Sequence, residues 1–304
     1  MTAVFRPGCA GPVGGGDVPE LPEVETVVRD LRPHLTGRRL SGVQVGDKAL
    51  RRPWNPAWKQ ALCGRSIEAM RRRGKWIVLD LVGESHLVFH LGMTGQLTVA
   101  DATEPVRDHT HLVFDLADPR KPWLARQLRF RDVRRFGSAT LFNTTAALQR
   151  AFDASALGPE PFVLADPWWA RYWQKRVRKS ERCLKAILLD QTVVAGVGNI
   201  YADEALFEAR LHPQRPGSSL APAAARRLRQ GVVTVLERAI TKRGSTIRDY
   251  IGGEGLRGGY QDEFRVYGRT GKPCVRCRTA IVVTRLAGRS MHYCPKCQRR
   301  KGEG

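Results

Sequence analysis

The chain has 304 residues, of which 51 are lysine or arginine and 29 are aspartate or glutamate, so its formal net charge is +22. This excess is larger than solubility requires and is typical of a protein that binds a polyanion, with nucleic acid as the first candidate. The sequence contains no run of 18 apolar residues, which argues against a membrane-spanning helix. Its N-terminus lacks the apolar core of a secretory signal, so we expect a cytoplasmic protein. The length suits two or three domains.

Basic residues gather in three short segments, at 71–75, 131–135 and 175–179. The last segment directly follows a group of aromatic residues, Trp168, Trp169, Tyr172 and Trp173. Each segment alone fits an ordinary solvated surface as well as it fits a binding site, so only the total charge favours nucleic acid.

The chain divides by pattern into an N-terminal extension and three domains. Residues 1–18 are rich in glycine and proline without periodicity, which predicts a disordered extension or a misassigned start. A helical period follows from Pro22 to Leu35, with Gly37 as a stop signal. We therefore expect an α+β multidomain protein with a catalytic domain at 19–150, a helical domain at 168–262 and a C-terminal module at 264–304.

Short apolar runs and helical periods support these domains. The strand-like runs predict a β-sandwich with flanking helices, and they lie at 75–82, 86–91, 109–116 and 136–142. The helical patterns lie at 168–180, 183–190, 200–209, 220–243 and 245–251. Residues 157–167 read as a linker between the two groups.

Four cysteines form two C-x-x-C pairs, Cys274 with Cys277 and Cys294 with Cys297, separated by sixteen residues. This spacing predicts a closed four-thiolate site for one structural Zn²⁺, which folds a module too small to have its own core. Free thiols are the alternative. The residues between the pairs read as a hairpin with Arg289 near its tip, where it can contact phosphate or simply remain solvated.

Six motifs in order resemble those of the formamidopyrimidine-DNA glycosylases. The first is Pro19-Glu20-Leu21-Pro22-Glu23-Val24-Glu25-Thr26, and the leucine in it is more similar to this branch than to the endonuclease VIII branch. The others are the zinc cysteines and the segments 90–95, 132–137, 157–161 and 196–201. The resemblance implies a bifunctional enzyme that excises oxidised purines from double-stranded DNA, acts as a monomer and contains a helix–two-turn–helix domain.

The resemblance implies that the nucleophile is the secondary amine of Pro19. An α-amino group titrates at about 7.7–8.0, so a large part of it is neutral at cellular pH. Glu20 would then assist opening of the sugar and Glu23 would position the site, although carboxylates at a helix N-terminus are common without any catalytic role. Lys75 and Arg289 resemble the residues that serve β- and δ-elimination.

Chemistry at a sugar carbon requires the damaged nucleotide to leave the base stack, and side chains must fill the gap. The resemblance assigns this to Met93, Arg134 and Phe136. Met93 lies between glycines on an expected hairpin turn, and the other two lie on a second turn. Core packing is the usual role of a lone methionine or phenylalanine, so these assignments depend on the resemblance.

Three further residues are candidate DNA contacts. Asn199 follows Gly196-Val197-Gly198, where we expect it to cap the next helix and the glycines to let backbone N–H groups approach phosphate. His109 and Lys179 are weaker candidates, because a strand histidine is usually structural and the residues at 178–183 contain an insertion relative to the family. The glycine-rich segment 252–260 resembles the loop that closes over the flipped base.

The sequence departs from the family in one respect: Pro19 is internal, so its nitrogen is an amide and cannot form a Schiff base. Translation from Val18, read as a GTG codon, followed by removal of the first residue would expose it. Three alternatives stay open. They are an endonuclease VIII-like enzyme for oxidised pyrimidines, a DNA-binding protein with a blocked nucleophile, and a basic zinc-ribbon protein that binds RNA.

Overall fold

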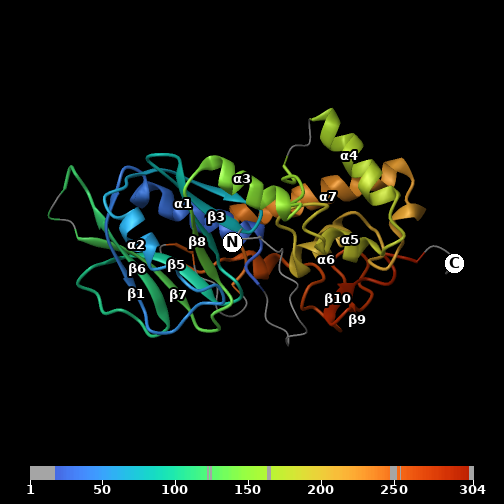
Figure 1. The fold of residues 1–304 in the computed structure, drawn as a ribbon. Helices are drawn as coiled ribbons and strands as arrows, with labels where there is room; N and C mark the ends of the chain where they lie inside the picture. The colour runs from blue at the N-terminus through green and yellow to red at the C-terminus, as the bar shows by residue number, and fades with distance from the viewer. Residues whose placement is uncertain are drawn as a thin grey trace. The chain divides into compact units, whose positions relative to one another are not determined.

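The computed structural model describes residues 18–121, 123, 125–162, 166–246, 252–253 and 255–300. The extension predicted at the N-terminus lies outside these residues, apart from Val18. Among the described residues, those within 18–153 and 243–259 form one compact unit, and those within 154–242 and 260–300 form another (Figure 1). The helical domain was expected to run from 168 to 262, but the structure groups 243–259 with the sandwich.

The first unit contains two four-stranded antiparallel sheets. One sheet has the order β1-β6-β7-β5, with β1 at Arg39–Val45, β6 at Thr110–Ala117, β7 at Arg126–Asp132 and β5 at Gly95–Asp101. The other has the order β2-β3-β4-β8, with β2 at Ile67–Arg73, β3 at Trp76–Leu81, β4 at Ser85–His90 and β8 at Ser138–Phe142. The expected β-sandwich is therefore confirmed, and the strand-like runs given as examples correspond to β3, β4, β6 and β8.

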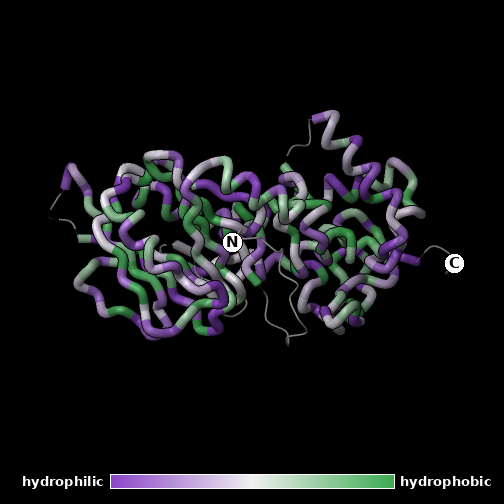
Figure 2. Tube along the Cα trace, in the orientation of Figure 1, coloured by the Kyte–Doolittle hydropathy of each residue, from purple (hydrophilic) through white to green (hydrophobic). Residues whose placement is uncertain are grey.

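Aromatic side chains join the two sheets at the centre of the sandwich. The ring of Phe89 on β4 lies 5.9 Å from that of Phe114 on β6 and 5.6 Å from that of Phe130 on β7. All three residues are fully buried. Figure 2 shows that apolar residues follow the strands of this unit, while hydrophilic residues dominate its outer loops.

Helix α1 (Leu21–Leu35) covers the sandwich and packs on β2, β3 and β5. Each residue of its apolar stripe is at most 1 % exposed; these residues are Val24, Val27, Val28, Leu31 and Leu35. Pro33 lies inside the helix without ending it. Two shorter helices complete the described helical part of this region, α2 at Ala57–Leu62 and α3 at Thr145–Ala154.

The second unit consists of helices and a hairpin. Its α-helices are α4 (Pro167–Arg178), α5 (Leu184–Leu189), α6 (Asn199–Glu208) and α7 (Pro222–Thr241). Two 3₁₀ turns, η1 and η2, lie at Gly217–Ser219 and Tyr260–Glu263, and the hairpin strands are β9 (Val282–Leu286) and β10 (Arg289–Tyr293). Most of the helix predicted at 245–251 falls outside the described residues. Among the helices of the described part, none is long and apolar enough to cross a membrane.

A buried ion pair ties the hairpin to the helices of this unit. Lys185 Nζ on α5 lies 2.6 Å from Asp203 Oδ1 on α6, and neither side chain has any exposed area. Lys185 Nζ also donates to the Ser290 carbonyl oxygen at 2.5 Å, and the His292 N–H donates to Asp203 Oδ2 at 2.9 Å. Three elements therefore depend on one desolvated pair.

Replacing Asp203 with alanine is expected to destabilise the protein strongly, because it leaves the buried Lys185 ammonium without its counter-charge. Loss of one partner of a buried pair costs about 3–5 kcal/mol. Glu263→Ala is the matched control, since Glu263 pairs with Lys242 at a site where the side chains are 41 % and 52 % exposed, and such pairs contribute at most about 1 kcal/mol. Urea unfolding of both variants measures the difference, and equal losses would contradict this account of the pair.

Candidate functional site

The N-terminus of α1 holds the residues that the sequence singles out for catalysis. Pro19 is buried, and Glu20 and Glu23 are each 2 % exposed. Glu20 is the N-cap of the helix, and its backbone N–H donates to Glu23 Oε2 at 2.9 Å in a capping-box arrangement. The cap fixes the direction in which the chain enters the helix and thus the position of Pro19.

The second carboxylate oxygen of Glu23 accepts two hydrogen bonds from a distant part of the same unit. The Ser245 N–H and the Ser245 hydroxyl donate to Glu23 Oε1 at 2.7 and 3.0 Å. Gly244 precedes this contact with a φ of +74°, and a Cβ atom there would lie 2.8 Å from Glu23 Oε1. A glycine is therefore needed at 244 for both its conformation and its space.

Asp30, about two turns further along α1, makes a second attachment to this segment. Its Oδ2 atom accepts from Arg243 Nη2 at 2.8 Å and from the Gly253 N–H at 3.0 Å. The side chain of Asp30 is 5 % exposed. The segment predicted at 252–260 to cover a flipped base thus begins at a point tied to α1.

Lys75 occupies the turn between β2 and β3, directly after Gly74. It lies close enough to His90, the last residue of β4, to affect that ring. Burial, followed by the charges of Lys75, Arg52 and Arg51, lowers the pKa of His90 to about 4. The neutral ring accepts the Gly92 N–H at Nδ1 over 3.0 Å. His90 belongs to a recognised motif, but sequence reasoning did not select it as a site residue.

Two loops that cross between the sheets carry the three residues predicted to fill the gap. Met93 lies between β4 and β5, and Arg134 and Phe136 lie between β7 and β8. The prediction that Met93 sits on a hairpin turn is wrong, because β4 and β5 belong to different sheets. A crossover between sheets places the loop at the rim of the sandwich.

Asp132 joins the two crossover loops. It is fully buried, and its Oδ1 atom accepts the Thr94 hydroxyl at 2.5 Å while its Oδ2 atom accepts the Gly137 N–H at 2.6 Å. The Arg134 N–H donates in turn to Thr94 Oγ1 at 2.9 Å. The backbones also approach closely, since a Cβ atom on Gly92 would lie 2.5 Å from the Gly137 nitrogen. The loops therefore form one rigid support.

The predicted gap-filling side chains project from this support. Met93, Arg134 and Phe136 are all partly exposed, and the Arg134 guanidinium carbon lies 4.9 Å from the centre of the Phe136 ring. His109 is exposed and has a φ of +65°. Its carbonyl oxygen accepts the Asp132 N–H at 2.9 Å, which connects His109 to the residue that joins the two loops. An arginine stacked on an aromatic ring at a loop tip suits contact with bases.

The second unit carries the remaining candidates. Asn199 is the first residue of α6 and Gly198 is its N-cap, so the prediction that Asn199 caps the helix is wrong. Its Nδ2 atom donates to Ser290 Oγ at 3.2 Å, next to Arg289 in sequence. Arg289 is exposed after the turn of the hairpin, as predicted. Lys179 is exposed at the C-terminal end of α4.

The four cysteines fit a structural zinc. The sulfur atoms of Cys274, Cys277, Cys294 and Cys297 all lie within 4.8 Å of one another. The distances between Cys277 and Cys294 and between Cys274 and Cys297 are 3.4 and 3.9 Å, and a tetrahedron with Zn–S bonds of about 2.3 Å has edges of about 3.8 Å. Burial and the neighbouring sulfur atoms raise the pKa of Cys297 to about 12. A Zn²⁺ ion bound among the four sulfur atoms would stabilise the thiolate form of each cysteine and so lower these pKa values.

A buried carboxylate on α6 holds the segment that leads into this module. Glu204 Oε1 accepts the backbone N–H groups of Arg265, Val266 and Tyr267 at 3.1, 2.9 and 2.8 Å. Burial raises the pKa of Glu204. Sequence reasoning missed this residue, since a glutamate within a helix gives no sign that it accepts bonds from a distant segment.

Removal of zinc is expected to unfold the C-terminal module and to leave the sandwich folded, because the module has few buried apolar residues besides its ligands. Elemental analysis should find one zinc per chain, and Cys277→Ser should lower this value. Hydrogen exchange should then rise across β9 and β10 but not across β3 and β4. A zinc-free protein with unchanged protection in the hairpin would contradict a structural role for the metal.

The low pKa of His90 predicts a loss of stability in acid. The ring is neutral in both states above its ordinary pKa of 6.5, and as the pH falls towards 4 only the unfolded chain takes up the proton. Between pH 7 and 4.5 this lowers the free energy of unfolding by about 2–3 kcal/mol. Urea unfolding should show a smaller fall for His90→Gln than for the wild type or for His34→Gln, whose histidine is exposed. Equal falls in all three proteins would refute the assignment.

Three family models match the chain. They are the formamidopyrimidine-DNA glycosylase N-terminal domain at residues 18–139, the formamidopyrimidine-DNA glycosylase H2TH domain at 157–250, and the zinc finger found in FPG and IleRS at 271–300. Together they span most of the chain. The first match begins at the residue before Pro19.

Relatives and solved structures agree with these models. The formamidopyrimidine-DNA glycosylase of Geobacillus kaustophilus is 42 % identical over 284 residues, which are 93 % of this chain and 100 % of the relative. A structure of Lactococcus lactis Fpg with DNA containing an abasic site has a TM-score of 0.82 at 34 % identity and covers 92 % of this chain and 100 % of its own. MutM in complex with DNA containing carbocyclic 8-oxo-G also gives a TM-score of 0.82 at 34 % identity, over 93 % and 100 % of the two chains.

Proposed function

We propose, since the chain belongs to the formamidopyrimidine-DNA glycosylase family, that it excises oxidised purines such as 8-oxoguanine and formamidopyrimidines from double-stranded DNA and then cleaves the strand. The arrangement of Pro19, Glu20 and Glu23 carries this proposal. It places Pro19 and two buried carboxylates next to one another at one fixed helix terminus. Solved relatives contain DNA with a formamidopyrimidine lesion, an abasic site or an 8-oxoguanine analogue, which supports the substrate class.

The proposed reaction starts at the Pro19 nitrogen. A neutral amine there attacks C1′ of the damaged nucleotide, forms an N–C1′ bond and displaces the base, which leaves with a proton. The sugar ring then opens as its oxygen receives a proton, and the nitrogen becomes an iminium. The iminium acidifies the C2′ proton, so elimination of the 3′ phosphate and then of the 5′ phosphate breaks the strand on both sides.

Glu20 is the proposed proton donor to the ring oxygen, and Glu23 is the proposed positioning residue. Glu20 is buried at the helix N-cap next to Pro19, where a carboxyl group can reach the sugar bound to that nitrogen. Proton transfer of this kind contributes about 10²–10⁴-fold to a rate. Glu23 uses both oxygens for hydrogen bonds within the protein, to Glu20 and Ser245, so it fixes geometry and does not transfer a proton.

Each unit also contributes cationic residues to the proposed reaction. Lys75 lies beside His90 on the sandwich and Arg289 lies at the zinc hairpin, and we assign them to phosphate binding and to the two elimination steps. Lys179, His109 and Asn199 are the proposed additional backbone contacts. Met93, Arg134 and Phe136 would fill the gap left by the flipped nucleotide, with Arg134 towards the orphaned base. The enzyme acts as a monomer in the cytoplasm and is bound to the nucleoid while it is on DNA.

The Pro19 amine must be free for this chemistry. While any residue precedes Pro19, its nitrogen is an amide with a delocalised lone pair and cannot attack C1′. The match of the family model from residue 18 supports our proposal that the active chain begins at Pro19. Peptides from residues 1–17 in the protein isolated from its native host would contradict it.

The substrate preference gives a direct test. A chain beginning at Pro19 should release 8-oxoguanine opposite cytosine at least tenfold faster than it releases thymine glycol opposite adenine, in single-turnover assays with both duplexes. The reverse order would favour the endonuclease VIII-like alternative. Tight binding to both duplexes without release of either base would favour a DNA-binding protein without the chemistry.

A further inference from the structure

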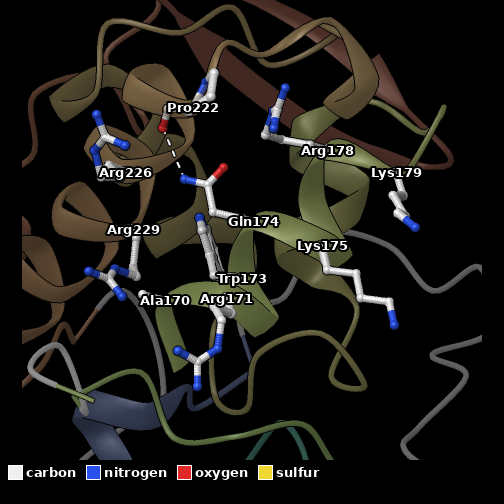
Figure 3. Close-up of a pocket in the computed structure, with 10 residues that line it drawn as sticks. All are labelled: Ala170, Arg171, Trp173, Gln174, Lys175, Arg178, Lys179, Pro222, Arg226 and Arg229. Carbon is white, nitrogen blue, oxygen red and sulfur yellow. Dashed lines mark hydrogen bonds between the residues drawn. The ribbon is translucent and has the colours of Figure 1, made fainter. Parts of the chain in front are cut away.

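A basic groove lies between α4 and α7 in the second unit, and of the residues assigned above Lys179 alone is among those that line it. It has a volume of about 710 Å³. Its lining residues are Ala170, Arg171, Trp173, Gln174, Lys175, Arg178, Lys179, Pro222, Arg226 and Arg229 (Figure 3). Six of these ten are cationic and none is acidic, so the groove is a strongly positive surface.

The structure holds the two walls of the groove together. The Gln174 Nε2 atom on α4 donates to the Pro222 carbonyl oxygen on α7 at 3.0 Å (Figure 3). Below it, the indole N–H of Trp173 donates to the Ala225 carbonyl oxygen at 2.8 Å, and Trp173 is 1 % exposed. The groove is thus a fixed feature of the packing between two helices, with a buried aromatic floor.

The cations of the groove lack acidic partners. Within the part of the chain that the structure describes, none of the six forms an ion pair with a carboxylate, whereas many other arginines of the chain do. The Arg229 Nη1 atom is buried and has no hydrogen-bond partner among the described residues.

The arrangement of the charges fits a polymer better than a single anion. Arg171 and Lys179 are eight residues apart on α4, which corresponds to about 12 Å along the helix axis. One strand of duplex DNA presents a phosphate about every 3.4 Å along its axis, so about three phosphates match this length. Arg226 and Arg229 face the same groove from α7.

We propose that this α4–α7 groove binds the phosphate backbone of DNA at a second site, in addition to the site where the lesion is processed. This proposal rests on the proposed function in one respect only, which is that the polyanion bound in the groove is DNA. The phosphates belong either to the same duplex, beyond the lesion, or to another duplex segment. Such a site raises the affinity for undamaged DNA and holds the enzyme on DNA between encounters with lesions.

The salt dependence of binding to undamaged 40-bp duplex tests the proposal. The groove variant combines Arg171→Ala, Lys175→Ala and Arg226→Ala. The control combines Arg120→Ala, Lys121→Ala and Arg126→Ala, which removes the same charge from exposed positions of the sandwich. Each lost phosphate contact lowers the slope of log K against log salt concentration by about 0.9. The groove variant should therefore lose about two to three units of slope and the control less than one.

Two further experiments show whether the phosphates in the groove belong to the lesion duplex itself or to another duplex. If the groove binds the same duplex, the difference between wild type and groove variant disappears on a 12-bp lesion duplex. If it binds another duplex, wild type saturated with a 12-bp duplex that contains a tetrahydrofuran analogue of the abasic site still captures labelled 40-bp DNA, and the groove variant does not. Equal slopes for the groove variant and the control on 40-bp DNA would overturn the proposal.

Two measurements keep this test independent of folding and of the proposed function. Thermal melting shows whether the triple variants fold, and if one does not, Lys175→Gln and Arg226→Gln singly should each lower the slope by about 0.9. Release of 8-oxoguanine by the wild-type chain beginning at Pro19 is measured in the same buffer. Failure of release contradicts the proposed function, and the slopes still decide the role of the groove.

Discussion

The carboxylate of Glu23 is the contact on which the proposed catalytic end of the molecule depends. One oxygen holds the Glu20 N–H and so fixes the residue after the proposed nucleophile, and the other holds Ser245, 222 residues away in the chain. Because both oxygens are occupied in a buried side chain, we expect a change at either partner to alter the position of Pro19. Glu23 therefore couples the proposed nucleophile to Ser245, and Asp30 on the same helix holds Gly253 in the segment expected to cover the damaged base.

Buried carboxylates that hold two segments of the chain together occur in both units. Asp132 joins the two crossover loops, Asp203 joins α6 to the zinc hairpin, and Glu204 holds the chain that enters the zinc module. Each of these carboxylates is at most 1 % exposed and accepts a hydrogen bond from a segment distant in sequence, which is the Thr94 hydroxyl for Asp132 and backbone N–H groups for Asp203 and Glu204. Charge-assisted hydrogen bonds of this kind are short and directional, which suits the rigid support that the proposed gap-filling side chains require. A chain with a net charge of +22 thus reserves several of its few acids for internal support and leaves its cations for DNA.

Sequence reasoning recovered the sandwich, the order of the helices and the zinc ligands, because strand runs, helical periods and cysteine spacing are local signals. It gave no specific range for β2 or β7, because arginines interrupt the apolar alternation in Ile67–Arg73 and Arg126–Asp132. It also placed Met93 on a hairpin, since a glycine-rich turn between two strands does not reveal that they belong to different sheets. Asp132, Glu204 and His90 were not selected for the same reason: their roles come from contacts with residues far away in the chain.

The account depends most on the identity of the nucleophile, and one measurement tests it directly. A chain beginning at Pro19 is mixed with an abasic-site duplex and borohydride, and the covalent product is digested and mapped by mass spectrometry. The account predicts reduced sugar on the Pro19 nitrogen, and no product from the chain in which residues precede Pro19. An adduct on Lys75 or another lysine, or equal trapping by both chains, would contradict it.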